Sequence, residues 1–189
     1  MPRSNPQSSA ESVLAALRAA TAQRHAAIDR GMPLSRQNPT HADYVDHLRL
    51  MRAWLVPLAA LPGASAHRQI ALIDADLAEA GLPVPAPAGQ SLANWRIDAH
   101  DSYRWGARYV IEGSRVGAAV LYRRLKDTLR PYELHFLRGG SGMSADRWPR
   151  FLRQMCTAVQ SPAEIDAACA GACECFDALL LLIAPREAA

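Results

Sequence analysis

Apolar residues along this chain recur every three or four positions, which is the period of an amphipathic α-helix. No stretch shows the strict two-residue alternation of a half-buried β-strand, and alanine and leucine are abundant. The pattern therefore predicts an all-α fold, and the residues that start and stop helices divide it into segments.

The first predicted helix begins after Ser8, which forms a capping box with Glu11, and ends before Gly31 and Pro33. Its apolar face carries residues at steps of three and four, namely Leu14, Leu17, Thr21, His25 and Ile28. Apart from His25, the polar positions are expected on the solvent side, as for Gln23, Arg24 and Asp29.

Two further helices are predicted in the N-terminal half. One begins at Thr40 and is bent or closed by Pro57, and the next runs from about His67 to Gly81. The apolar face of the first of these is formed by Tyr44, Leu48, Met51 and Leu55. The proline-rich residues 82–91 follow, and we expect a stiff connector there.

The C-terminal half is expected to hold three more helices. A long one covers about 102–129, and the glycine-rich residues 138–144 form a flexible break before a short helix over 146–159. Ser161, Pro162 and Glu164 then open the last helix with a cap, a first-turn proline and a capping-box acid.

Length and composition agree with one domain: the chain has 189 residues, of which half are apolar. We expect a polar, disordered segment over 1–11, one helical domain over 12–184 and a tail over 185–189. The N-terminus lacks the apolar core of a secretory signal, and the run ALLLLIA is far too short to span a bilayer. We therefore expect a cytoplasmic protein that does not bind membrane. The net charge of +3 is dispersed along the chain, so we expect no binding to nucleic acid.

The four cysteines do not suggest a metal site. Cys156, Cys169, Cys173 and Cys175 are spaced by 13, 4 and 2 residues, with no histidine after them, unlike the paired spacing of zinc ligands. Reduced thiols in the core are the favoured interpretation.

Two features point to a ligand between helices. His25 lies on an apolar face, where it is either a core histidine with a hydrogen-bond partner or a metal ligand. Gly113 and Gly117 lie one turn apart inside a predicted helix, where each costs about 1 kcal/mol relative to alanine. The pair allows either close helix packing or the approach of a flat ligand, and a haem between the two helices explains both features together.

The sequence around these residues resembles the haem oxygenases. LRAATAQRHAAID, residues 17–29, is similar to their proximal helix, and ARYVIEGSRVGAAVLYRRL, residues 107–125, resembles the distal-helix signature of the bacterial branch, usually YVLEGSxLGG. The later segments HFLRGGSGMSADRWPRFL and ACECFDALLLLI resemble the C-terminal pattern of that branch. The resemblance covers about residues 12–183 in the same order.

The resemblance implies a single-domain, multi-helix fold that holds haem b between a proximal and a distal helix. Haem is then both substrate and cofactor, and O2 with electrons from a ferredoxin or an NADPH-type reductase converts it to biliverdin, CO and Fe2+. The product would supply a bacteriophytochrome or accompany iron acquisition. His25 would be the proximal iron ligand, while Gly113, Ser114 and Gly117 would form the catalytic distal side.

The resemblance also implies which residues contact the haem. They are Arg18, Thr21, His25, Tyr109, Gly113, Gly117 and Phe176. Arg18 and Tyr109 match positions that bind the haem propionates, although each has a simpler role open to it, in solvent or in the core. Ser114 either holds a water molecule near bound oxygen or bonds back to a helix carbonyl.

The chain departs from the family pattern at two places. Ala118 replaces the usual second glycine of the distal signature, and residues 162–184 contain no Lys or Arg for the propionates. The basic residues Arg123, Arg124, Lys126 and Arg130 form either a solvated face or a docking patch for an acidic electron donor. Two other functions stay open: a haem-binding or haem-sensing protein without turnover, and a haem-free helical interaction module.

Overall fold

The computed structural model describes the backbone of residues 6–83, 100–141 and 146–183, and the side chains within these ranges except those of residues 6–11, 140 and 141. Helices are the regular secondary structure of these parts, which contain no strand, as the sequence pattern predicts. The helices are α1 (Pro6–Gly31), α2 (His41–Leu58), α3 (Ala66–Glu79), α4 (Asp101–Leu125), α5 (His135–Ser141), α6 (Arg147–Ala158) and α7 (Pro162–Ile183). A short 3-10 turn, η1 (Pro33–Ser35), follows α1.

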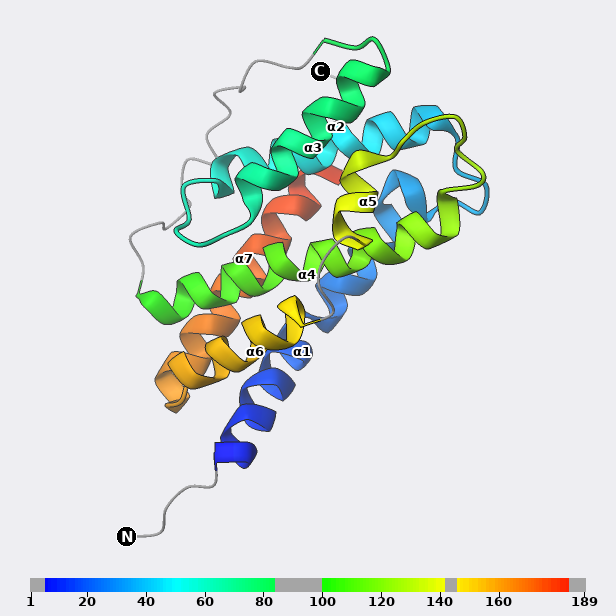
Figure 1. Ribbon diagram of the computed structural model, residues 1–189. Helices are drawn as coiled ribbons and strands as arrows, with labels where there is room; N and C mark the ends of the chain where they lie inside the picture. The colour runs from blue at the N-terminus through cyan, green and yellow to red at the C-terminus, as the bar shows by residue number, and fades with distance from the viewer. Residues whose placement is uncertain (1–5, 84–99, 142–145, 184–189) are drawn as a thin grey trace, which may run out of the picture.

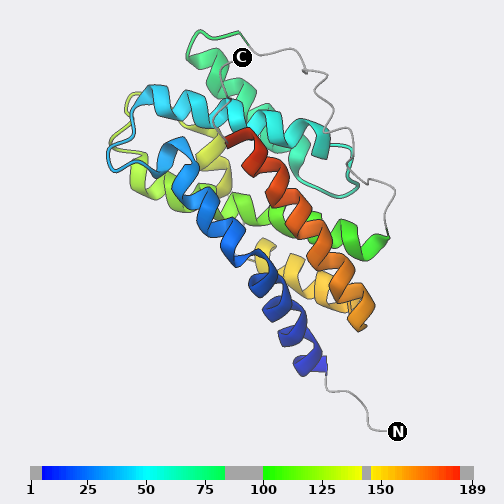
Figure 2. The ribbon, with the colours of Figure 1, turned by 180° about the vertical axis from the view of Figure 1, so that it is seen from behind.

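Helix α4 runs across the middle of the molecule, with α2 and α3 on one side of it and α6 on the other (Figure 1). Seen from behind, α1 and α7 lie side by side and cross the face of the molecule opposite α4 (Figure 2). The most extensive packing joins α4 to α7, and α7 also contacts α1 and α2. The result is one domain in which α1 and α4 lie on either side of a common space.

The close packing of α4 on α7 depends on two glycines. A Cβ atom added at Gly106 would overlap the carbonyl oxygen of Ala168, and one added at Gly171 would overlap the carbonyl oxygen of Tyr103. On the other side of α7, Trp54 of α2 is fully buried and donates its indole N–H to the carbonyl oxygen of Cys175 at 2.9 Å. These contacts fix α7 as the element against which α2 and α4 are positioned.

Two helix starts agree with the sequence. Thr40 Oγ1 accepts the N–H of Asp43 while Asp43 Oδ2 accepts the N–H of Thr40, which is the reciprocal capping box of α2. Ser161 and Glu164 exchange the same pair of hydrogen bonds at the start of α7. Pro57 lies one residue before the end of α2, so it closes this helix.

Three predicted boundaries are wrong. α1 begins at Pro6 and not after Ser8. Proline is compatible with the first turn of a helix, where no intrahelical N–H bond is required. Residues 6–11, which were expected to be disordered, are therefore helical. α4 ends at Leu125, and residues 126–129 form turns that bond back to it, as from Leu129 N to Leu125 O at 2.9 Å. The connector expected over 82–91 stays a prediction, because residues 84–99 lie outside the described part of the chain.

After the start of α1 and the end of α4, the third wrong prediction is the glycine-rich break expected over 138–144. Its first four residues belong to α5, and residues 142–145 lie outside the described part of the chain. Asp76 of α3 explains the helix, because its carboxylate accepts the backbone N–H groups of His135 and Phe136 at 2.7 and 2.8 Å. A cap supplied by a distant helix offsets the weak local helix propensity of the glycines.

Candidate functional site

A largely apolar cavity of about 540 Å³ lies between α1 and α4. Helices α2 and α7 contribute its remaining walls, together with η1 and single residues of α5 and α6. Its apolar lining includes Met32, Met51, Trp54, Val110, Phe136 and Leu179. A cavity of this size with few polar groups suits a flat, mainly apolar small molecule.

His25 stands at this cavity and is not a core histidine. Its side chain is 62 % exposed, and it lines the cavity from α1. Nδ1 lies 2.9 Å from Oδ2 of Asp29, one turn further along the helix. Asp29, which the sequence placed on the solvent side, therefore also lines the cavity and engages one ring nitrogen, so that Nε2 is left for a ligand.

Gly113 and Gly117 line the opposite wall, on α4. A Cβ at Gly113 would meet only the ring of Trp148, at an ordinary contact distance of 3.6 Å, and one at Gly117 would meet no atom within 4 Å. Close helix packing therefore does not explain this pair. In α4 that task falls to Gly106, which the sequence analysis did not single out.

Tyr109 and Arg18 lie close enough to interact. Tyr109 lines the cavity from α4, with its ring centroid 5.6 Å from that of Trp148. Burial raises the pKa of Tyr109, and the charge and hydrogen bond of Arg18 partly offset that rise. Arg18 itself is exposed on α1 and does not form part of the cavity wall.

The other predicted contacts divide into two groups. Phe176 lines the cavity from α7, and its ring centroid lies 5.9 Å from that of His25. Ser114 also lines the cavity, but its hydroxyl donates to the carbonyl oxygen of Ile111 at 2.8 Å, as one of its two expected roles requires. Thr21 is buried, donates to the carbonyl oxygen of Leu17 at 2.7 Å and does not reach the cavity.

Ala118, which replaces the usual glycine, lies on the cavity wall. It is 4 % exposed, and it also belongs to the hydrophobic core. Its methyl group is therefore held between the core and the cavity.

His47 is a cavity residue that the sequence analysis missed. It is 5 % exposed, on α2, and its ring centroid lies 6.2 Å from that of Phe136. Burial lowers the pKa of His47 to about 4, so the ring is neutral at pH 7. The signal was present in the sequence, since His47 is three residues after Tyr44 and four before Met51, both on the apolar face of the helix.

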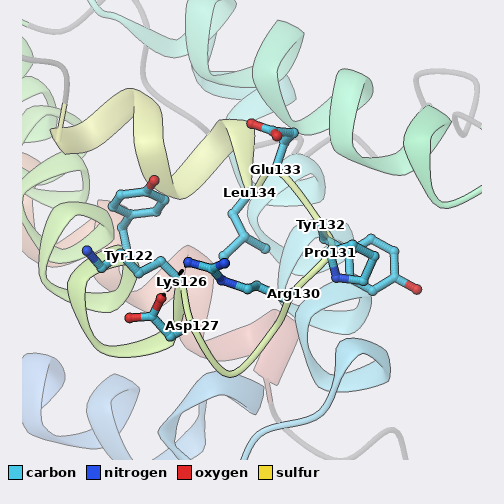
Figure 3. Close-up of a pocket in the computed structure, with 8 residues that line it drawn as sticks. All are labelled: Tyr122, Lys126, Asp127, Arg130, Pro131, Tyr132, Glu133 and Leu134. Carbon is cyan, nitrogen blue, oxygen red and sulfur yellow. Dashed lines mark hydrogen bonds and ion pairs between the residues drawn. The ribbon is translucent and has the colours of Figure 1, made fainter.

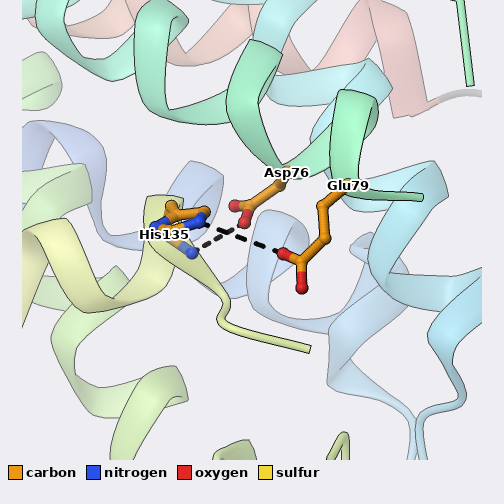
Figure 4. A group of neighbouring side chains, drawn as sticks. All are labelled: Asp76, Glu79 and His135. Atoms are coloured by element: carbon orange, nitrogen blue, oxygen red, sulfur yellow. Dashed lines mark hydrogen bonds and ion pairs between the residues drawn. The ribbon is translucent and has the colours of Figure 1, made fainter. Parts of the chain in front are cut away.

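A cluster of Asp76, Glu79 and His135 has the composition of a metal site, with ligand atoms within 4.8 Å of one another (Figure 4). Both oxygens of Asp76 are already used, because they accept the two N–H groups at the start of α5 and the hydroxyl of Tyr44 at 2.6 Å. Nε2 of His135 lies 4.0 Å from Glu79 Oε2. Asp76 therefore serves as the cap of α5.

A second hollow, of about 500 Å³, lies where α4 leads into α5 (Figure 3). Lys126 and Arg130 line it, and Arg130 forms an exposed ion pair with Asp127 at 3.1 Å. Arg123 and Arg124 are exposed on the last turn of α4, and Arg124 donates to the carbonyl oxygen of Leu34. The four cations of the predicted docking patch thus lie around the C-terminal end of α4.

The chain matches no family model, and no curated protein is similar to it at a significant level. Among the described helices, none is long and apolar enough to cross a membrane.

Proposed function

We propose that this chain is a haem oxygenase, which binds haem b between α1 and α4 and opens the ring oxidatively. The observation that carries the proposal is the pair Gly113 and Gly117, which line the cavity where an added Cβ would touch almost no protein atom. Each glycine costs about 1 kcal/mol of helix stability. A flat ligand pressed against this wall accounts for two residues that protein packing does not require.

His25 is the proposed iron ligand. The contact between its Nδ1 and Asp29 orients the ring and favours a proton on Nδ1, which leaves the Nε2 lone pair for a metal. A metal-binding histidine ordinarily donates its second N–H to a carboxylate, a backbone carbonyl or a water molecule. The pair thus gives the α1 side of the cavity the donor set that a haem iron requires.

The rim of the cavity also fits haem. Val116 and Val120 are 38 % and 52 % exposed on α4, and a bound ring would cover these apolar side chains. Arg18 and Tyr109 offer a guanidinium and a hydroxyl for the propionates. An imidazole on one side, bare backbone on the other and these two polar groups together match the shape and chemistry of haem.

When bound, haem supplies the iron that activates O2, and opening of its ring yields biliverdin, CO and Fe2+. In this proposal α4 excludes bulky groups above the ring, and Phe176 packs beside the His25 imidazole. Ser114 is limited to accepting a hydrogen bond, since its own proton is donated to Ile111.

Electrons are proposed to come from an acidic ferredoxin or an NADPH-type reductase that docks on the exposed cations Arg123, Lys126 and Arg130. Biliverdin would pass to a bacteriophytochrome or leave as a product of iron acquisition. We place the reaction in the cytoplasm, where a reducing environment keeps thiols unpaired, as all four cysteines are here.

The proposal is tested by titrating the protein with hemin and then adding a ferredoxin reducing system in air. We expect a Soret band that decays as a bilin band grows in the red, and we expect His25→Ala to lose the native axial ligation. A Soret band that persists would instead identify a haem binder without turnover, which Ala118 at the cavity wall favours as the second candidate. If no Soret band forms, the haem proposal is wrong in both versions.

A further inference from the structure

His47 lines the cavity, and one nitrogen of its ring is buried without a hydrogen-bond partner. Among the described residues, three side-chain nitrogens are buried without a hydrogen-bond partner: His47 Nδ1, Arg108 Nε and Arg115 NH1. Of these residues only His47 lines the cavity. An unpaired buried polar group costs on the order of 1–3 kcal/mol of folding free energy, so His47 destabilises the ligand-free protein at this position.

The surroundings of the two ring nitrogens indicate where the proton of the neutral ring resides. Nδ1 has no acceptor within reach, and a proton placed there would be a buried N–H without a partner. Nε2 is not among the buried, unpaired atoms, and the ring otherwise contacts Phe136. Because a neutral imidazole carries one proton, the less costly tautomer is the one with the proton on Nε2.

Two other polar side chains of the cavity are already engaged. Nδ1 of His25 is paired with Asp29, and the Ser114 hydroxyl donates to the carbonyl oxygen of Ile111. Of the side chains of His25, Ser114 and His47, only that of His47 therefore has an N–H donor left for a molecule in the cavity.

We infer that His47 presents an Nε2–H donor to the cavity and hydrogen-bonds the polar atom or water molecule bound between α1 and α4. In the setting of the proposed function, on which this step rests, the donor would hydrogen-bond a small anionic or polar ligand of the bound haem. His47 is thus a positioning residue for the bound molecule, supplied by α2 and not by α4.

The tautomer is measured first, without haem. Long-range 1H–15N correlation spectra of the wild-type protein at pH 7 should show His47 as the neutral ring with the proton on Nε2. A proton on Nδ1 would overturn the inference. This readout requires no variant, so it holds even if substitutions at His47 impair folding.

The donor itself is tested with two ligands of the hemin complex. Fluoride accepts hydrogen bonds strongly, whereas CO, bound after reduction, accepts them weakly. His47→Leu should lower fluoride affinity about tenfold or more with little change in CO affinity. His47→Gln, which retains an N–H donor, should recover part of the loss. The matched control is His67→Leu, which removes an exposed imidazole on α3 outside the cavity and should change neither affinity.

The two failures are distinguishable. If the wild-type protein binds no hemin, the proposed function is wrong, and the NMR spectrum alone decides the tautomer. If hemin binds and His47→Leu keeps the full fluoride affinity, the inference about His47 is wrong while the haem proposal stands.

Discussion

Nδ1 of His25 lies 2.9 Å from Oδ2 of Asp29, one helical turn further along α1, and both residues line the same cavity. On the haem proposal this carboxylate orients the iron ligand and increases its basicity. Asp29→Ala is therefore expected to weaken hemin binding about tenfold or more and to lower the iron–histidine stretching frequency of the reduced complex, measured by resonance Raman spectroscopy.

The stability of the ligand-free protein serves as the control for Asp29→Ala. The contact between His25 and Asp29 is exposed, so its loss should change the free energy of unfolding by less than about 1 kcal/mol. Asp46→Ala removes another exposed carboxylate, which pairs with Arg49 at 3.4 Å on α2, and should leave hemin binding unchanged. Equal hemin affinity in Asp29→Ala and wild type would remove Asp29 from the site.

Substitution by alanine should have opposite effects on stability at Gly117 and at Gly106. Gly117→Ala adds a methyl group that meets no atom within 4 Å, so it should stabilise the ligand-free protein by up to about 1 kcal/mol through helix propensity. Gly106→Ala forces a methyl group against the carbonyl oxygen of Ala168 and should destabilise the protein by about 1–3 kcal/mol. Urea denaturation measures both.

Hemin titration separates the two glycines further. Gly117→Leu fills the cavity from α4 and should weaken hemin binding, although it leaves the ligand-free protein folded. If Gly117→Leu binds hemin as tightly as wild type does, the ring does not lie against this part of α4.

The sequence predicts most of the fold because the signals are local. The capping boxes of α2 and α7 involve residues three positions apart, and the apolar period fixes the helices between them. The prediction fails where a residue far away in the sequence determines whether a helix forms. Asp76 caps α5 from another helix, and no sequence pattern near residue 138 indicates that bond.

The residues of the candidate site can be predicted from the sequence where a local pattern marks them, as for the fold. His25 and the pair Gly113 and Gly117 stand out because each contradicts its helical surroundings, and the structure brings them to one cavity. The packing role of Gly106 could not be read, since it depends on the backbone of α7. His47 was readable by the same rule that singled out His25, namely a histidine on an apolar face.

The buried His47 should also make the free energy of unfolding depend on pH. Its pKa is lowered to about 4 in the folded protein, against about 6.5 for an exposed histidine, so between these values the unfolded chain binds a proton that the folded protein does not. Its contribution is complete above about pH 6.5 and is lost as the pH falls toward 4. Over this range the loss is on the order of 3 kcal/mol.

Denaturation of wild type and His47→Leu at pH 7 and pH 5 measures this effect. The loss of stability on acidification should be smaller in the variant, because it has no group to protonate at this position. The same loss in both proteins would show that the imidazole of His47 is solvated in the folded state.

Glu112 is expected to be essential for stability but not to contact the ligand. It is buried on α4, where Oε1 accepts the N–H of Ser65 at 3.1 Å and Oε2 lies 3.6 and 3.5 Å from nitrogens of Arg115 and Arg147. Glu112→Ala leaves the buried Arg115 guanidinium without its counter-ion and should cost about 3–5 kcal/mol of unfolding free energy.

Glu133→Ala is the control for this substitution, since it removes an exposed carboxylate that pairs with Arg138 at 2.7 Å. Its cost should be below about 1 kcal/mol. A similarly small cost for Glu112→Ala in urea denaturation would mean that solvent compensates the Arg115 charge.

The mass of the pigment extracted after the hemin complex has reacted with O2 and a ferredoxin reducing system tests the proposed ring opening. We expect biliverdin with the wild-type protein and none with His25→Ala. Recovery of intact haem alone, under conditions where the complex is reduced and oxygen is present, would contradict it.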